Sequence, residues 1–104
     1  MQPAVLILCT CPNEESASRL AEALVSERLA ACVNVLASVK SVYRWKDAVE
    51  TATEHLLLIK TTDARFPAVR ARIIELHSYD TPEIIGVPIT AGSETYMSWL
   101  AAQV

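Results

Sequence analysis

The stretch that decides the fold is Ala31–Thr62, ACVNVLASVKSVYRWKDAVETATEHLLLIKTT. It predicts two long strands, Ala31–Trp45 and Val49–Thr62, which fold back on each other around Lys46-Asp47-Ala48. In the first strand most odd positions are apolar: Val33, Val35, Ala37, Val39, Tyr43 and Trp45. The even positions include Asn34, Ser38, Lys40, Arg44 and Lys46, and this period of two is typical of a strand with one buried face.

The tip of this hairpin is expected to project from the domain. A fully extended strand of this length would run about 50 Å at roughly 3.3 Å per residue, whereas a compact domain of this size has a radius of gyration of about 13 Å. A kink or bulge near Ala37-Ser38 would not change this conclusion. Because Tyr43 and Trp45 would then lie in water unless another chain covered them, the hairpin predicts an oligomer.

The chain before the hairpin predicts one strand and one helix. Ala4–Thr10 is a short apolar run of the kind that forms a buried strand. Asn13 is a good N-cap, and Glu14 and Glu15 place carboxylates in the first turn of a helix that continues to about Arg28.

The chain after the hairpin predicts a helix, a strand and a last helix. The second helix begins at Thr62 or Asp63 and is broken before Pro82, the strand is Glu83–Ile89, and Gly92-Ser93 leads into the last helix. The predicted inner faces are Phe66, Val69, Ile73, Leu76 and His77 in the second helix, and Tyr96, Trp99, Leu100 and Val104 in the last.

This order of elements predicts an α+β fold, a ferredoxin-like βαββαβ sandwich with an extra C-terminal helix, as one domain over residues 1–104. Both main helices would cover the same face of the antiparallel sheet. The runs Val5–Leu8, Leu56–Ile59 and Ile84-Ile85 nevertheless place apolar side chains on both faces. We therefore expect the sheet of another subunit to cover the second face.

Composition excludes several classes of function. A net charge of −3 argues against a nucleic-acid or anionic-membrane surface, and two glycines are too few for a phosphate-binding loop. No apolar run reaches the roughly 18 residues needed to span a bilayer, and the N-terminus lacks the features of a signal peptide. Three cysteines, an odd number, fit reduced thiols better than a disulfide framework, so we expect a soluble cytoplasmic protein.

At this point the chain resembles the CutA family of divalent-cation tolerance proteins. The resemblance rests on Cys9-Thr10 with Pro12-Asn13, Leu29–Asn34, Val42–Trp45, Leu57–Thr61, Glu75–His77 before Tyr79, Thr81–Ile84, Pro88-Ile89, Gly92 and Tyr96–Leu100. It implies a PII-like homotrimer with clefts between subunits. The chain departs from the family pattern at Ser78, where proline is usual, at Asp47, where glycine is usual, and at Ala37-Ser38, where Pro-Gly is common.

The resemblance also suggests a metal site. Cys32 corresponds to the family's characteristic cysteine and is either a soft ligand for Cu²⁺ or another divalent transition metal, or a small buried hydrophobe. His77 either supplies an imidazole ligand or caps its helix. With Glu83, these side chains would form a metal site if they converged across a subunit interface.

Cys9 and Cys11 form a Cys-x-Cys pair whose thiols share one face of a strand, with Cys9 in the core and Cys11 exposed. They are a possible second metal site, for surface capture of Cu⁺, although two thiols alone complete no tetrahedral zinc site. His55 is interpreted as a structural cross-strand residue, and Glu50 and Glu54 as solvated. The residues expected at the subunit interface or cleft are Tyr43, Trp45, Lys60, Tyr79 and Trp99.

Several functions compete for this sequence. We expect a trimeric metal-binding protein linked to copper tolerance, with no organic cofactor; the sequence does not identify a protein partner. The alternative is a trimeric scaffold or PII-like small-ligand sensor with incidental metal binding. We expect no enzymatic activity, because no base, orienting residue or oxyanion loop accompanies Cys32 and His77. RNA binding is disfavoured because the aromatic pattern of RNA-recognition domains is absent.

Overall fold

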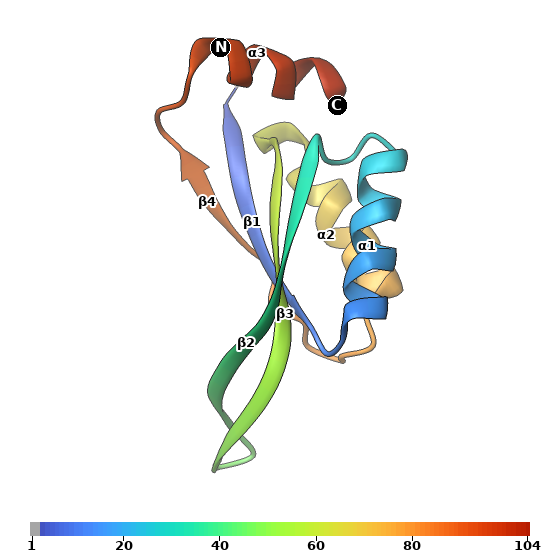
Figure 1. Cartoon of the computed structure of the whole chain (residues 1–104), viewed down its shortest axis with the longest axis vertical. Coiled ribbons are helices and arrows are strands. Elements are labelled where there is room, and N and C mark those ends of the chain that lie inside the picture. The colour runs from blue at the N-terminus through green and yellow to red at the C-terminus, as the bar shows by residue number, and fades with distance from the viewer. Residues whose placement is uncertain (1–2) are drawn as a thin grey trace.

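A four-stranded antiparallel sheet in the order β2-β3-β1-β4 forms the centre of the fold (Figure 1). The computed structural model describes residues 3–104. Its elements are β1 (Ala4–Cys11), α1 (Glu14–Ser26), β2 (Cys32–Trp45), β3 (Ala48–Thr62), a 3₁₀ turn (Asp63–Arg65), α2 (Phe66–Leu76), β4 (Ile85–Ile89) and α3 (Glu94–Gln103). The order confirms the predicted ferredoxin-like α+β fold with an added C-terminal helix.

The long hairpin of β2 and β3 projects from the body of the molecule, as predicted (Figure 1). The molecule measures 44 × 25 × 23 Å along its principal axes. The strands turn at Lys46 and Asp47, which have φ angles of 50° and 64°, and Trp45 pairs with Ala48. A two-residue turn with positive φ at both positions matches the right-handed twist of the strands.

A β-bulge in β2 changes which side chains share a face. The register moves from Leu36 opposite Leu56 to Val39 opposite Glu54, so β2 contains one extra residue, and Ser38 has a φ of 59°. The prediction that all odd positions of β2 share one face was therefore wrong, because one extra residue reverses the alternation. Val33 packs in the core under the helices, whereas Tyr43 lies on the opposite face.

Helices α1 and α2 cover one face of the sheet (Figure 1). The side chains that they bury completely include Ile7, Cys9, Leu57 and Ile59 of the sheet and Leu24, Val69 and Ile73 of the helices. Asn13 caps α1 as predicted, accepting a hydrogen bond of 2.9 Å from the amide of Ser16.

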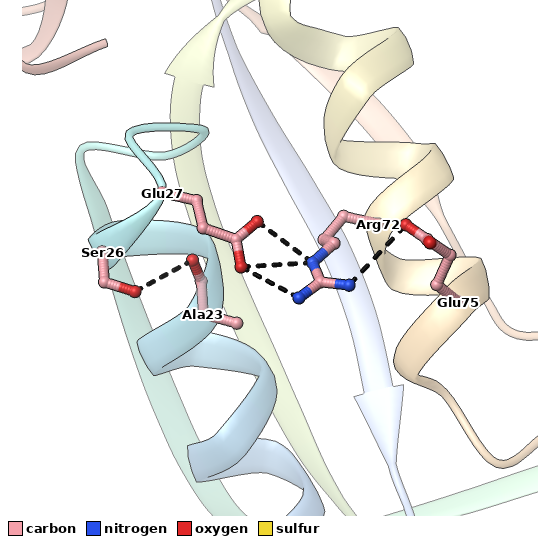
Figure 2. A network of polar contacts seen from close by, with 5 residues as sticks. All are labelled: Ala23, Ser26, Glu27, Arg72 and Glu75. Carbon is pink, nitrogen blue, oxygen red and sulfur yellow. Dashed lines mark hydrogen bonds and ion pairs between the residues drawn. The ribbon is translucent and has the colours of Figure 1, made fainter.

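An ion-pair network joins the C-terminal end of α1 to α2 (Figure 2). Arg72 of α2 donates from Nε and Nη2 to the carboxylate of Glu27, at distances between 2.9 and 3.2 Å. Its Nη1 lies 3.7 Å from the carboxylate of Glu75 on the same helix. The bidentate geometry fixes α2 against the C-terminal end of α1.

Helix boundaries and faces depart from the predictions in two places. The predicted helix start at Thr62 or Asp63 leads into the 3₁₀ turn, and α2 itself begins at Phe66. In α3 the buried side chains are Met97 and Leu100, while Tyr96 and Trp99 are exposed, so the predicted inner face was wrong for both aromatic residues.

The second face of the sheet remains open over most of its length. Ile85 and Val87 of β4 are 50% and 45% exposed, and Leu6, Leu8, Leu56 and Leu58 beside them are only half-buried. At one end α3 packs on this face through a small cluster of Ala4, Ala31, Met97 and Leu100. Within residues 3–104, no helix is both long and apolar enough to span a membrane.

Candidate functional site

Two thiols and one imidazole converge at the end of β1. One ligand atom from each of Cys9, Cys11 and His77 lies within 4.8 Å of the others. Strand alternation directs both cysteines to the helix-covered face, because they are two residues apart. Helix α2 ends at Leu76, and this places His77 at its C-cap, next to β1.

The position of His77 is fixed by two backbone groups. Its Nε2 lies 2.7 Å from the carbonyl oxygen of Thr10, and its Nδ1 lies 3.1 Å from the amide nitrogen of Tyr79. A carbonyl only accepts and an amide N–H only donates, so the imidazole is neutral with its proton on Nε2. The carbonyl of Thr10 is available because β4 pairs with β1 only as far as Leu8.

The two thiols are buried and differ in acidity. Cys9 and Cys11 are 0% and 1% exposed, so the predicted exposure of Cys11 was wrong. The reason is that α1 starts directly after the strand and covers it. The interaction with Cys9 lowers the pKa of the Cys11 thiol, whereas the same interaction and burial raise that of Cys9. Cys11 is therefore the first to become a thiolate, the form that binds metal ions.

This set of donors suits a soft or borderline metal ion. Thiolate sulfur selects Cu⁺ and Zn²⁺, and imidazole suits both zinc and copper. The sequence predicted Cys9 and Cys11 as an isolated pair; the structure adds His77 to them. A metal ion that binds His77 must replace one of its two backbone hydrogen bonds, since both ring nitrogens are engaged.

Cys32 lies at the other end of the sheet. Cys32 pairs with Lys60 of β3, and Cys11 pairs with His55 of the same strand. Lys60 and His55 are five residues, or about 16 Å, apart along β3, so the two cysteines are separated by a similar distance. Lys60 donates from Nζ to Cys32 Sγ at 3.6 Å and also to Asn34 Oδ1. Within one chain Cys32 does not approach His77, so their predicted convergence would require a second subunit and stays a prediction.

Cys9, Cys11 and His77 together form the metal-ligand cluster. A pocket of about 630 Å³ lies on the open side of the sheet, behind this cluster. It is lined by Tyr43, Trp45 and Glu54 of the hairpin, by Thr10, and by the loop from Tyr79 to Glu83. Three of the predicted cleft residues, Tyr43, Trp45 and Tyr79, therefore come together here. The other two do not, because Lys60 contacts Cys32 and Trp99 contacts Tyr96 on α3.

One polar contact in this pocket was not anticipated. The hydroxyl of Tyr79 donates to Oε2 of Glu54 at 2.8 Å, and Glu54 is only 7% exposed, so its predicted solvation was wrong. Burial and this hydrogen bond raise the pKa of Tyr79 above its ordinary value. Glu83 lines the same pocket, and its negative charge contributes to the raised pKa of Cys9.

The chain is similar to known proteins over nearly its whole length. Residues 5–103 match the family described as CutA1 divalent ion tolerance protein. The divalent-cation tolerance protein CutA of Thermus thermophilus is 47% identical over 95 residues, which are 91% of this chain and 92% of that protein. The crystal structure of CutA1 from Oryza sativa has a TM-score of 0.96 at 40% identity and covers 98% of this chain and 94% of its own. The structure described as the periplasmic divalent cation tolerance protein CutA from Archaeoglobus fulgidus has a TM-score of 0.93 at 36% identity, over 96% and 97% of the two chains.

Proposed function

We propose that this chain, which belongs to the CutA1 family of divalent ion tolerance proteins, is a non-catalytic trimer that binds a transition-metal ion. The observation that carries the proposal is the convergence of Cys9, Cys11 and His77. Three strong ligands from two separate elements, all within 4.8 Å, are more than a buried core requires. Copper, the metal that the family resemblance suggests, is compatible with two sulfur donors and one imidazole.

In this proposal, each residue of the cluster has a distinct role. Cys11, with its lowered thiol pKa, supplies the first thiolate, and Cys9 loses its proton when the metal binds. His77 supplies a neutral imidazole that needs no deprotonation before it coordinates. The cluster binds and retains the ion, and the chain performs no bond-breaking step.

The open face of the sheet supports the trimer. Half-buried leucines and exposed Ile85 and Val87 form an apolar surface that a second sheet would remove from water. Tyr43 and Trp45, exposed on the projecting hairpin, are suited to anchor it on a neighbouring subunit. We propose that the cytoplasm is the compartment, because all three cysteines are free thiols.

A PII-like sensor of small ligands is the second candidate. The observation that favours it is the pocket of about 630 Å³, which is large enough for a small organic molecule and is lined by aromatic and acidic side chains. In that case the metal would be incidental, and the trimer would present the pocket as a cleft between subunits.

The test is a calorimetric titration of the reduced protein with Cu⁺ and Zn²⁺, with the mass measured by light scattering. We expect a trimer with saturable binding at one ion per chain, which Cys11→Ser and His77→Gln abolish. Cys32→Ser is the matched control, because its thiol lies at the far end of the sheet. Loss of binding in Cys32→Ser alone would move the site to the subunit interface, and weak, non-stoichiometric heat from a clean trimer would favour the sensor.

A further inference from the structure

His55 stands directly beside the metal-ligand cluster without belonging to it. It is the cross-strand partner of Cys11, so the two side chains leave the same face of the sheet. Directly opposed residues in an antiparallel pair have Cβ atoms about 5 Å apart. His77 reaches the end of β1 from its free edge, at Thr10, whereas His55 belongs to β3 on the other edge. Two imidazoles thus flank Cys11 from opposite sides.

The ring of His55 carries an unexplained polar atom. Its Nδ1 is shielded from water and finds no hydrogen-bond partner anywhere in residues 3–104. A buried polar atom without a hydrogen-bond partner destabilises the fold, whereas His77 has partners for both of its ring nitrogens. An unpartnered nitrogen on the residue directly opposite Cys11 is explained if its natural partner is an ion.

The backbone around His55 is also irregular. The bulge in β2 lies directly opposite it, because Leu36 pairs with Leu56 on one side and Val39 pairs with Glu54 on the other. Bulges are common next to functional sites, where they change the direction in which a side chain points. The bulge therefore lies opposite His55, the one residue of β3 that has a metal-binding side chain on the same face as the cluster.

We infer that His55 is the fourth ligand of the metal site, which closes as a tetrahedral Cys₂His₂ centre of Cys9, Cys11, His55 and His77. The inference rests on the proposed metal-binding function and deepens it. Two sulfur and two nitrogen donors in a tetrahedron are the preferred environment of Zn²⁺, whereas Cu²⁺ favours square-planar or tetragonal nitrogen and oxygen donors. The site therefore selects Zn²⁺ over Cu²⁺. Its closure requires the side chain of His55 to turn toward the ion, because only the other three ligands lie within 4.8 Å of one another in the structure.

The first experiment uses Co²⁺ as a spectroscopic probe on the full-length, reduced protein without oxygen. We expect the intense visible bands of tetrahedral Co²⁺ together with sulfur-to-metal charge transfer, and displacement of Co²⁺ by Zn²⁺. His55→Leu should lower the Zn²⁺ affinity on the order of 100-fold, at least as much as loss of an outer-shell partner costs. Without metal, the His55→Leu variant should be at least as stable to unfolding as the original chain, because the substitution removes the unsatisfied Nδ1.

The matched control is Thr53→Ala, two residues along the same face of β3 and exposed, which should leave the spectrum and affinity unchanged. X-ray absorption of the zinc-loaded original chain counts imidazoles without any variant and is decisive if His55→Leu does not fold. Two imidazoles support the proposal. One imidazole, or an unchanged spectrum and affinity in His55→Leu, overturns it while leaving the three-ligand site intact. Absence of binding by the original chain would overturn both this inference and the metal-binding function.

Discussion

Ile59 and Leu58 are neighbours on β3, yet they have different surroundings. Ile59 points under α1 and α2 and is fully buried, whereas Leu58 points to the open face and is only half-buried. The same contrast runs along β1, where Ile7 is buried and Leu6 and Leu8 remain partly exposed. The two faces carry similar apolar side chains but differ in whether the chain itself covers them.

This difference separates folding from assembly. The helix-covered face buries its side chains within one chain, so its contacts determine whether the chain folds. The open face leaves the same kind of surface in water, and its burial awaits another chain. The metal-ligand cluster lies on the covered face and the large pocket on the open one, so metal binding and assembly are expected to respond to different substitutions.

The largest expected effect comes from truncating the covered face. Ile59→Ala should lower the free energy of unfolding by about 2–5 kcal/mol, because it leaves a cavity in a packed core. Leu58→Ala, one residue away, should change the folding of the isolated chain much less and weaken self-association instead. Urea unfolding and concentration-dependent light scattering separate the two quantities. Equal losses of folding stability in both variants would contradict the distinction between the faces.

The strands and their order could be predicted from the sequence because apolar alternation and turn residues are local signals. Both strands of the hairpin, the cap at Asn13 and the projecting tip follow from such signals. The reversal of faces beyond Ser38 could not be predicted, because a bulge depends on pairing with the partner strand and Ser38 is no typical left-handed residue.

The candidate site was harder to predict than the fold. The alternation in β1 correctly placed Cys9 and Cys11 on one face, but their meeting with His77 depends on the angle at which α2 crosses the sheet. Cys32 was linked to His77 by the family resemblance and by ligand chemistry, and the register places Cys32 at the opposite end of the sheet. Likewise, the burial of Glu54 depends on a tyrosine 25 residues away in sequence.

A smaller effect is expected from Trp45→Ala, which tests the open side at the hairpin tip. Trp45 is 50% exposed in the single chain, so its removal should change the free energy of unfolding by no more than about 0.5 kcal/mol. As an interface anchor it should instead weaken the trimer by about 2 kcal/mol. Val49→Ala is the control, because Val49 is 67% exposed on the opposite side of the same hairpin. A variant that stays trimeric at micromolar concentration with unchanged melting would refute this role for Trp45.

Tyr79→Phe tests the pocket on the open side. It should lower the free energy of unfolding by about 1.5 kcal/mol, because it removes the hydrogen bond from the Tyr79 hydroxyl to the buried carboxylate of Glu54. The pKa of Tyr79 is raised above its ordinary value of about 10. The folded chain therefore keeps a proton that the unfolded chain releases, and stability is full below pH of about 10 and falls above it. Thermal unfolding from neutral to alkaline pH should show a shallower fall in Tyr79→Phe. The remaining slope is expected from Tyr96, whose pKa is also raised, and an unchanged slope would exclude Tyr79 as its source.

The smallest effect concerns the bulge that directs the aromatic side chains to the open face. Ser38 adopts a φ of 59°. In this left-handed region a residue that has a Cβ destabilises the folded chain by about 1–2 kcal/mol relative to glycine. Glycine recovers that cost but loses about 0.5–1 kcal/mol through the greater entropy of its unfolded state. Ser38→Gly should therefore stabilise the chain by about 0.5 kcal/mol in urea unfolding. Ser41→Gly on the same strand, where the backbone has no positive φ, should destabilise it by a similar amount. If both substitutions destabilised the chain equally, the left-handed geometry at Ser38 would be wrong, and with it the bulge that turns Tyr43 and Trp45 away from the helix-covered face.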